Sequence, residues 1–213
     1  MFGEYKLRTQ FIKIGDVKIH IVDEGGDLFR YRRGDVSVLL KRGEGKFEVV
    51  PAPAEGYGVK ILLIDFEDRI LIPPKEEVGF YLSAPVEAEV RLGETVIDRF
   101  HVSREKYALY GTPEVGAIAR YWTSKVYPSE PDSTCVLRVS VINGTAKWRE
   151  MDHIVVYIRD SVMFYSGERA YYPLVMVEFK SDVPEVNNTG KPPKEGLKPS
   201  KEPLPLPNFL MRW

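Results

Sequence analysis

The sequence predicts an all-β protein, with one or two antiparallel β-sandwich units followed by a Pro-rich, extended C-terminal tail. Three observations lead to this fold class. Apolar and polar residues alternate with a period of two in nearly every segment. Turns of Gly, Pro and Asp interrupt the alternation about every 8–12 residues. No segment shows helical spacing over more than two turns.

In the first half of the chain, the alternation predicts a series of short strands. Val17, Ile19 and Ile21 share one face, while Lys18 and His20 lie on the other. The same pattern recurs over residues 36–40, 78–82, 86–92 and 96–102. Residues 59–64 differ, because apolar side chains occupy both faces, and this predicts a strand that is buried on both sides.

The second half continues the pattern over residues 135–141, 154–158, 162–164 and 171–179. The dipeptide Asn143-Gly144 predicts a tight hairpin between the first two of these segments.

The turn-rich stretch 106–122 separates the halves and holds aromatics, two glycines and a proline, as expected where two β layers or two β units join. The predicted division is 1–112 for an N-terminal β-sandwich unit, 113–182 for a C-terminal β unit that could merge with the first, and 183–213 for the tail.

The tail changes abruptly in composition. Residues 187–207 are rich in Pro, Lys, Gly and Glu, so this stretch cannot bury much apolar area and should be extended or disordered. Large apolar side chains gather at its end, and we predict that it binds a partner. The predicted contact residues are Leu206, Phe209, Leu210 and Trp213. Two alternatives stay open: the tail binds another protein or a neighbouring subunit, or it folds back onto its own domain.

Charge and composition exclude several classes of protein. The 30 basic and 31 acidic residues leave no basic excess of the kind that phosphate-neutralising nucleic-acid binders show. Phe29, Tyr31 and Arg33 alternate along one segment, as in a strand that stacks bases, but an amphipathic edge strand is the favoured interpretation. Nucleic acid is therefore not an expected partner. The abundance of Lys and Glu with few amide side chains favours a thermophilic source.

Cys135 is the single cysteine, which excludes an intrachain disulfide and a cysteine-based zinc site within one chain. No motif for a nucleotide, metal or nucleophilic site occurs, so we expect no cofactor and no metal. His20, His101 and His153 fall in different predicted strands. The first residues lack a signal-peptide pattern, and no apolar run approaches the ~20 residues of a membrane span. A cytoplasmic location without a membrane span is the expectation.

The predicted faces bury two charged side chains, Asp98 and Arg120. Buried charge is costly unless it is paired, so the two are predicted to form an ion pair. In a functional interpretation they form the centre of a cleft that also contains Lys106, Tyr110 and Tyr121. The favoured interpretation is a structural salt bridge that joins the two halves.

The block Lys106–Gly111, with Gly116, Arg120 and Tyr121, resembles an uncharacterised archaeal all-β family of unknown function. The segments 72–74 and 83–86 also look like that family. The resemblance covers most of residues 1–180 and does not extend to the tail. It implies an archaeal, all-β protein, and it implies no activity, cofactor or catalytic residue.

The function favoured by the sequence is that of a non-catalytic binding or accessory protein that associates with a protein partner through its tail. The alternative is an enzyme that processes a small molecule or carbohydrate in a cleft around Asp98, Tyr110 and Arg120. An enzyme should show a deep pocket with converging polar groups. A binding protein should show an apolar patch or an open sheet edge. The sequence does not indicate an oligomeric state.

Overall fold

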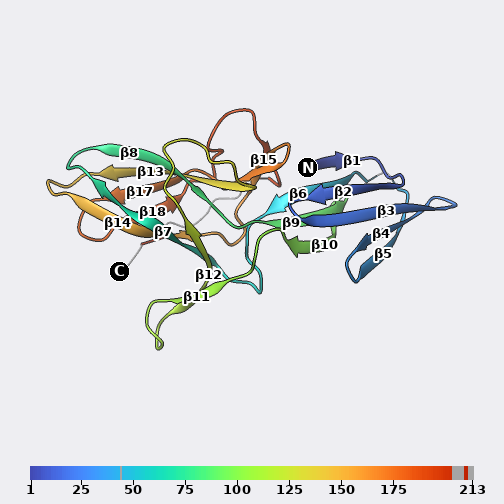
Figure 1. The fold of residues 1–213 in the computed structure, drawn as a ribbon, viewed down its shortest axis with the longest axis horizontal. Helices are drawn as coiled ribbons and strands as arrows, with labels where there is room; N and C mark the ends of the chain where they lie inside the picture. Colours follow the sequence, from blue (N-terminus) through green and yellow to red (C-terminus); the bar gives the residue numbers. More distant parts are fainter. Residues whose placement is uncertain (44, 203–208, 211–213) are drawn as a thin grey trace.

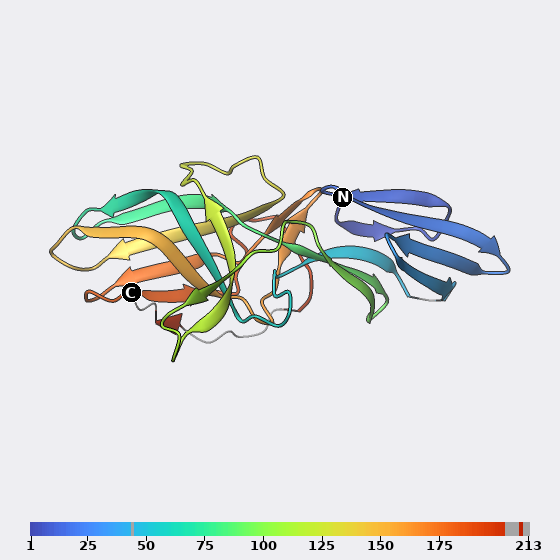
Figure 2. The ribbon, with the colours of Figure 1, turned by 60° about the horizontal axis from the view of Figure 1, so that its bottom comes forward.

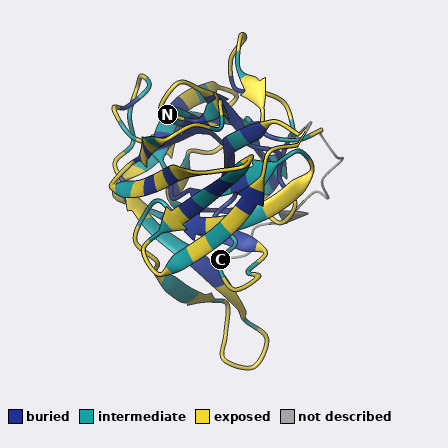
Figure 3. Cartoon of the chain, turned by 90° about the vertical axis from the view of Figure 1, so that its right-hand side faces the viewer, coloured by how far each residue is buried: buried dark blue, intermediate teal, exposed yellow. Residues whose placement is uncertain are grey.

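The computed structural model describes residues 1–43, 45–202 and 209–210. These residues form strands and connecting loops without any helix, which confirms the all-β class. The molecule is elongated, with the N-terminal strands gathered at one end and most of the later strands at the other (Figure 1). Buried segments lie at the centre of the view along this long axis, and exposed residues line the outside and the projecting loops (Figure 3).

The N-terminal end contains two four-stranded antiparallel sheets. Sheet A has the order β1 (Gly3–Tyr5), β6 (Phe47–Ala52), β9 (Glu87–Leu92) and β10 (Thr95–His101). Sheet B has the order β2 (Gln10–Ile14), β3 (Val17–Gly25), β4 (Leu28–Arg33) and β5 (Val36–Lys41). The predicted alternation holds in β3, where Ile19 and Ile21 are buried while Lys18 and His20 are exposed. Strand β4 lies between β3 and β5, so its prediction as an edge strand is wrong.

The other end contains sheets C and D. Sheet C has the order β11 (Tyr107–Tyr110), β12 (Ala117–Ser124), β7 (Ile61–Ile72) and β14 (Arg149–Tyr157). Sheet D has the order β19 (Lys198–Pro199), β15 (Phe164–Ser166), β16 (Arg169–Tyr171), β13 (Cys135–Asn143), β17 (Val175–Phe179), β18 (Glu185–Asn188) and β20 (Phe209–Leu210), with β8 (Glu77–Ser83) also paired to β13. The pairs β12–β7, β13–β16 and β13–β17 are parallel, so the prediction of purely antiparallel sheets is wrong here.

The chain passes between the two ends after β6, after β8 and after β10. Strands β7 and β8 therefore join sheets C and D, while β9 and β10 return to sheet A. The side chain of Tyr172 lies at this junction and is buried. Its hydroxyl accepts a hydrogen bond from the Ala54 amide at 3.0 Å and donates to the Pro85 carbonyl at 3.1 Å. The predicted boundaries at residues 112 and 182, and the packing of the sheets as β-sandwiches, stay predictions.

The Asn143-Gly144 dipeptide does not form the predicted hairpin. It follows β13 in sheet D, whereas the next strand, β14, belongs to sheet C. The Asn143 side-chain nitrogen lies 3.1, 2.9 and 2.8 Å from the carbonyl oxygens of Ile72, Pro73 and Lys147. The side chain therefore holds together a connection between two sheets, because it satisfies backbone acceptors that a ladder would otherwise satisfy.

Residues 183–202 contact the body of the molecule and include strands β18 and β19. The disordered alternative is therefore wrong for the described part of 187–207, and the extended alternative stays a prediction. Asn188 is buried, and its Nδ2 donates to the Tyr157 carbonyl at 3.1 Å. Ser200 is also buried, and its hydroxyl accepts a hydrogen bond from the Met163 amide at 3.1 Å.

The end of the predicted partner-binding tail is described only in part. The backbone of Phe209 and Leu210 pairs antiparallel with Val186 and Glu185 of β18. Leu206 and Trp213 lie outside the described residues. The backbone of β20 pairs with a strand of its own chain, as in the alternative in which the tail folds back onto its own domain.

Removing residues 203–213 should lower Tm by a few degrees without changing the oligomeric state, since the deletion takes β20 away from the edge of sheet D. Calorimetry and analytical ultracentrifugation measure the two quantities. A deletion of 211–213 alone, which keeps β20, is the matched control. An unchanged Tm combined with dissociation of an oligomer would instead support a tail that binds a neighbouring subunit.

Candidate functional site

A groove of about 1290 Å³ lies on the face of sheet C that points away from the core. Strand β7 forms its floor because of the alternation in that strand. Leu62 and Ile64 point into the core and are fully buried, whereas Ile61, Leu63 and Asp65 line the groove. We call this feature the sheet C groove. Its lining residues are Tyr57–Ile61, Leu63, Asp65, Tyr110–Thr112, Val115, Ala117, Ile118, His153 and Tyr157.

Side chains of the β11–β12 hairpin line one side of the sheet C groove. The hairpin projects from the body (Figures 1 and 2). Gly111 has a φ of 101°, and a Cβ atom on it would lie 3.0 Å from the Gly116 Cα. The tight connection therefore requires glycine. The Tyr110 ring lies 6.4 Å from the His153 ring of β14, so the hairpin reaches the strand at the far side of sheet C.

Large apolar side chains are exposed at the lip of the groove. Tyr57 is 89%, Val115 84% and Ile118 56% exposed. Beneath them, Ile61 and Leu63 of the floor are buried. A contiguous apolar surface of this kind on a folded domain usually marks a binding site.

One end of the groove is polar. The Tyr121 hydroxyl donates to Asp65 Oδ2 at 2.8 Å, and the Thr123 hydroxyl lies 3.4 Å from the Tyr121 hydroxyl. Asp65 and His153 face each other in the β7–β14 ladder. The His153 Nδ1 lies 2.7 Å from Asp152 Oδ1. A carboxylate, a phenol and an imidazole therefore lie at one end of a largely apolar channel.

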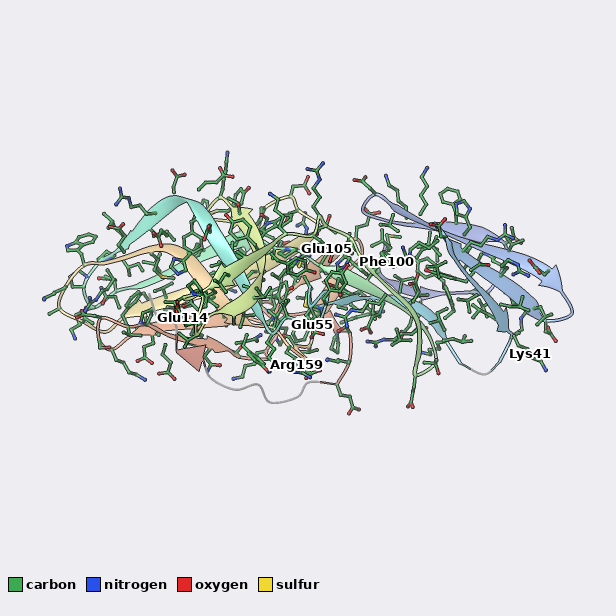
Figure 4. All side chains as sticks on the ribbon, turned by 90° about the horizontal axis from the view of Figure 1, so that it is seen from below. Lys41, Glu55, Phe100, Glu105, Glu114 and Arg159 are labelled. Atoms are coloured by element: carbon green, nitrogen blue, oxygen red, sulfur yellow. The ribbon has the colours of Figure 1, made fainter. Side chains whose placement is uncertain are left out.

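A second polar cluster lies where the two ends of the molecule meet, around Glu87. This carboxylate is buried, and it accepts hydrogen bonds from Arg99 Nε at 2.5 Å and from the Gly56 amide at 2.6 Å. The His101 ring lies between Glu87 Oε1 at 3.2 Å and Glu105 Oε1 at 2.8 Å. Figure 4 shows Glu105 and Glu55 in this central region, far from Lys41 at the end of the N-terminal sheets. Burial lowers the pKa of Arg99, but Glu87 and other carboxylates outweigh it and leave that pKa raised.

Arg120 is fully buried next to this cluster. Its Nη2 donates to the Arg104 carbonyl at 2.8 Å, and its Nη1 lies 3.7 Å from Glu105 Oε1. Its guanidinium carbon lies 5.3 Å from the centre of the Tyr107 ring. Burial and the hydrogen bond to Glu105 raise the pKa of the Tyr107 hydroxyl. Arg120 therefore connects sheet C to the segment after β10 and does not line the sheet C groove.

Asp98 lies in β10 and binds Arg33 of β4, so the predicted pairing with Arg120 is wrong. Arg33 Nε donates to Asp98 Oδ2 at 2.6 Å and Nη2 donates to Oδ1 at 3.0 Å. The hydroxyl of the buried Tyr31 donates to Oδ2 at 2.5 Å. Burial, followed by the hydrogen bond to Asp98, raises the pKa of Tyr31 far above its usual range. The Asp98 carboxylate thus joins sheet A to sheet B.

The structure brings together only part of the set predicted from the sequence. Tyr110 lines the sheet C groove, and Tyr121 contacts its polar end through Asp65. Lys106 is exposed, and its carbonyl accepts a hydrogen bond from the Tyr121 amide at 2.8 Å. Asp98 and Arg120 lie in two other clusters. The groove residues that sequence reasoning missed are Tyr57, Ile61, Leu63, Asp65, Val115, Ile118, His153 and Tyr157.

Two further features bear on chemistry. Cys135 is buried, as its place in the alternation predicts, and burial raises the pKa of its thiol far above the ordinary value. Within the described ranges, no group of three or more His, Cys, Asp or Glu side chains is placed to hold a metal ion. Residues 1–43, 45–202 and 209–210 contain no helix long and apolar enough to cross a membrane.

The sequence model of the family described as "Protein of unknown function (DUF432)" matches residues 1–212. No curated protein and no solved structure matches the chain. The predicted resemblance to a family of unknown function is therefore confirmed, and the match extends beyond residue 180 through most of the predicted tail. An archaeal source stays a prediction.

Proposed function

The chain belongs to the DUF432 family, whose function is unknown, and we propose that it is a non-catalytic binding protein. Its sheet C groove takes an extended apolar segment of another polypeptide. The observation that carries this proposal is the exposed lip of Tyr57, Val115 and Ile118 above a buried apolar floor. Leaving such a surface in water costs free energy that a bound apolar segment recovers, at about 25 cal/mol per Å² of apolar surface covered.

The size and composition of the groove support a polypeptide ligand. At about 1290 Å³ the groove exceeds the roughly 300–1,000 Å³ that is usual for small-molecule pockets. Tyr57, Tyr110 and Tyr157 line it. Tyrosine is enriched where proteins bind proteins, because its ring supplies apolar contact and its hydroxyl supplies a hydrogen bond. A peptide with large apolar side chains spaced along an extended backbone fits this combination.

The groove replaces the C-terminal tail as the partner-facing element in this proposal. The backbone of Phe209 and Leu210 already pairs with β18 of the same chain. That pairing leaves the tail fewer backbone groups for a partner, whereas the lip of the groove stays exposed.

Selection of a random dodecapeptide library on the full-length protein tests the proposal. We expect enriched peptides with two or more large apolar residues. The substitution Ile118→Asp should weaken their binding by about tenfold or more, because a charge at the lip must lose water when the peptide binds. Fluorescence anisotropy of a labelled enriched peptide measures the change.

Leu39→Asp provides the matched control. Leu39 is 50% exposed, close to the 56% of Ile118, but it lies on β5 in sheet B. This control should bind the enriched peptide as tightly as the unsubstituted protein. The proposal fails if apolar peptides are not enriched, or if both substitutions weaken binding equally.

A further inference from the structure

We infer that the polypeptide segment bound in the sheet C groove carries a lysine or arginine side chain, and that Asp65 binds its positive charge. This inference rests on the proposed function and adds the chemical class of the ligand to it. It follows from the contacts of Asp65, from its aromatic surroundings and from the treatment of other shielded carboxylates in the chain.

Asp65 lines the groove, and its carboxylate has only one side satisfied within the described residues. Oδ2 accepts the hydrogen bond from Tyr121 at 2.8 Å. No lysine or arginine in the described ranges forms an ion pair with the Asp65 carboxylate. Oδ1 can therefore accept a hydrogen bond from a ligand, while Tyr121 holds the carboxylate in place.

Three other shielded carboxylates of this chain have cationic partners. Asp98 binds Arg33, and Glu87 binds Arg99. Glu130 contacts Lys194 at 2.7 Å and Arg169 at 2.6 Å. Burial raises the pKa of Glu130, but hydrogen bonds from Lys194, Tyr171 and Arg169 outweigh it and lower that pKa to about 2.

Partly buried charge is costly without a partner, and for these three carboxylates the chain supplies the partner. Asp65 departs from this pattern, and the partner it lacks is a cation supplied from outside.

The surroundings of Asp65 suit a cation better than a neutral donor. Tyr121 contacts the carboxylate directly, and the tyrosine ring of Tyr110 lines the same groove. Aromatic rings attract a lysine or arginine head group through their quadrupole, most strongly where water is displaced. The apolar stem of such a side chain can lie along Leu63 and Ile61 of the floor, as long cationic side chains do on apolar surfaces.

The test uses the peptides enriched on the full-length protein, in matched pairs that carry lysine or norleucine at one position. Norleucine keeps the hydrocarbon stem and removes the ammonium group. We expect the unsubstituted protein to prefer the lysine peptide by about tenfold, a difference of about 1.4 kcal/mol. Asp65→Asn, which keeps the shape and an acceptor for Tyr121, should abolish the preference while still binding both peptides. Asp68→Asn, an exposed position on the same strand, should keep it.

The outcomes separate the two proposals. If the unsubstituted protein binds the lysine and norleucine peptides equally, the role of Asp65 is refuted and the apolar groove stands. If Asp65→Asn retains the preference, the cation binds elsewhere and the inference is again refuted. If the unsubstituted protein enriches no apolar peptide, the proposed function itself fails, and the assignment to Asp65 falls with it.

Discussion

Replacing Glu87 with leucine should lower the free energy of unfolding by about 3–5 kcal/mol, the range observed when one member of a buried ion pair is removed. The substitution would leave Arg99 Nε and the Gly56 amide without their buried acceptor. His101 would also lose the carboxylate that lies 3.2 Å from its Nδ1. Because these groups lie where the two ends of the molecule meet, the loss should loosen the junction. Urea denaturation measures the change.

Glu94→Leu is the control for this experiment. Glu94 is exposed in the turn between β9 and β10 of the same sheet. Its substitution should change the free energy of unfolding by no more than about 0.5 kcal/mol. If Glu87→Leu destabilised the protein no more than Glu94→Leu, the Glu87 cluster would have no role in holding the junction.

The substitution Asp98→Asn should lower the free energy of unfolding by about 2–3 kcal/mol, because it removes the charge that two nitrogens of Arg33 bind. The figure is smaller than for Glu87, because asparagine keeps a hydrogen-bond acceptor where leucine does not, and because the Asp98 side chain is 7% exposed against 2% for Glu87. Tyr31 would keep an acceptor, but the new amide nitrogen would face the guanidinium.

Peptide binding separates a structural role of Asp98 from a role in a cleft. Asp98 lies in sheet A, away from the sheet C groove. Asp98→Asn should therefore lose stability and keep its affinity for the enriched peptide. A loss of affinity at unchanged Tm would restore the interpretation of Asp98 as part of a cleft.

Local patterns predicted much of the fold. The apolar run at Ile61–Ile64 predicted a strand buried on both sides, and all of its residues are buried in β7. In β13, Cys135, Leu137 and Val139 are buried. Arg138, which lies between Leu137 and Val139, is exposed, as the alternation requires. These predictions succeeded because successive side chains of a strand point to opposite faces, so the burial of each face can be read from alternate residues in the sequence.

The pairing of strands could not be predicted in the same way. Strand β12 pairs in parallel with β7, and the two are separated in the chain by three strands of sheets A and D together with β11. Asn143-Gly144 matched a common hairpin turn, yet β13 and β14 lie in different sheets. Which strands pair depends on the packing of the whole molecule, and a turn dipeptide carries only local information.

The candidate site was missed for a related reason. Asp98, Arg33 and Tyr31 were each recognised as unusual, but the ion pair joins residues 65 positions apart. The sheet C groove draws on β7, β14, the β11–β12 hairpin and the loop at Tyr57, so no single segment shows it. The one available signal was Ile61, Leu63 and Asp65 on a common face, where a carboxylate follows two apolar residues.

The most direct test of peptide binding in the sheet C groove is the NMR spectrum of the full-length protein, labelled in its methyl groups and titrated with an enriched apolar peptide. We expect the methyl signals of Ile61, Leu63, Val115 and Ile118 to shift, while the signals of Leu39 on sheet B do not. Shifts confined to sheet B, or to the residues beside β20, would contradict the assignment of the sheet C groove as the binding site.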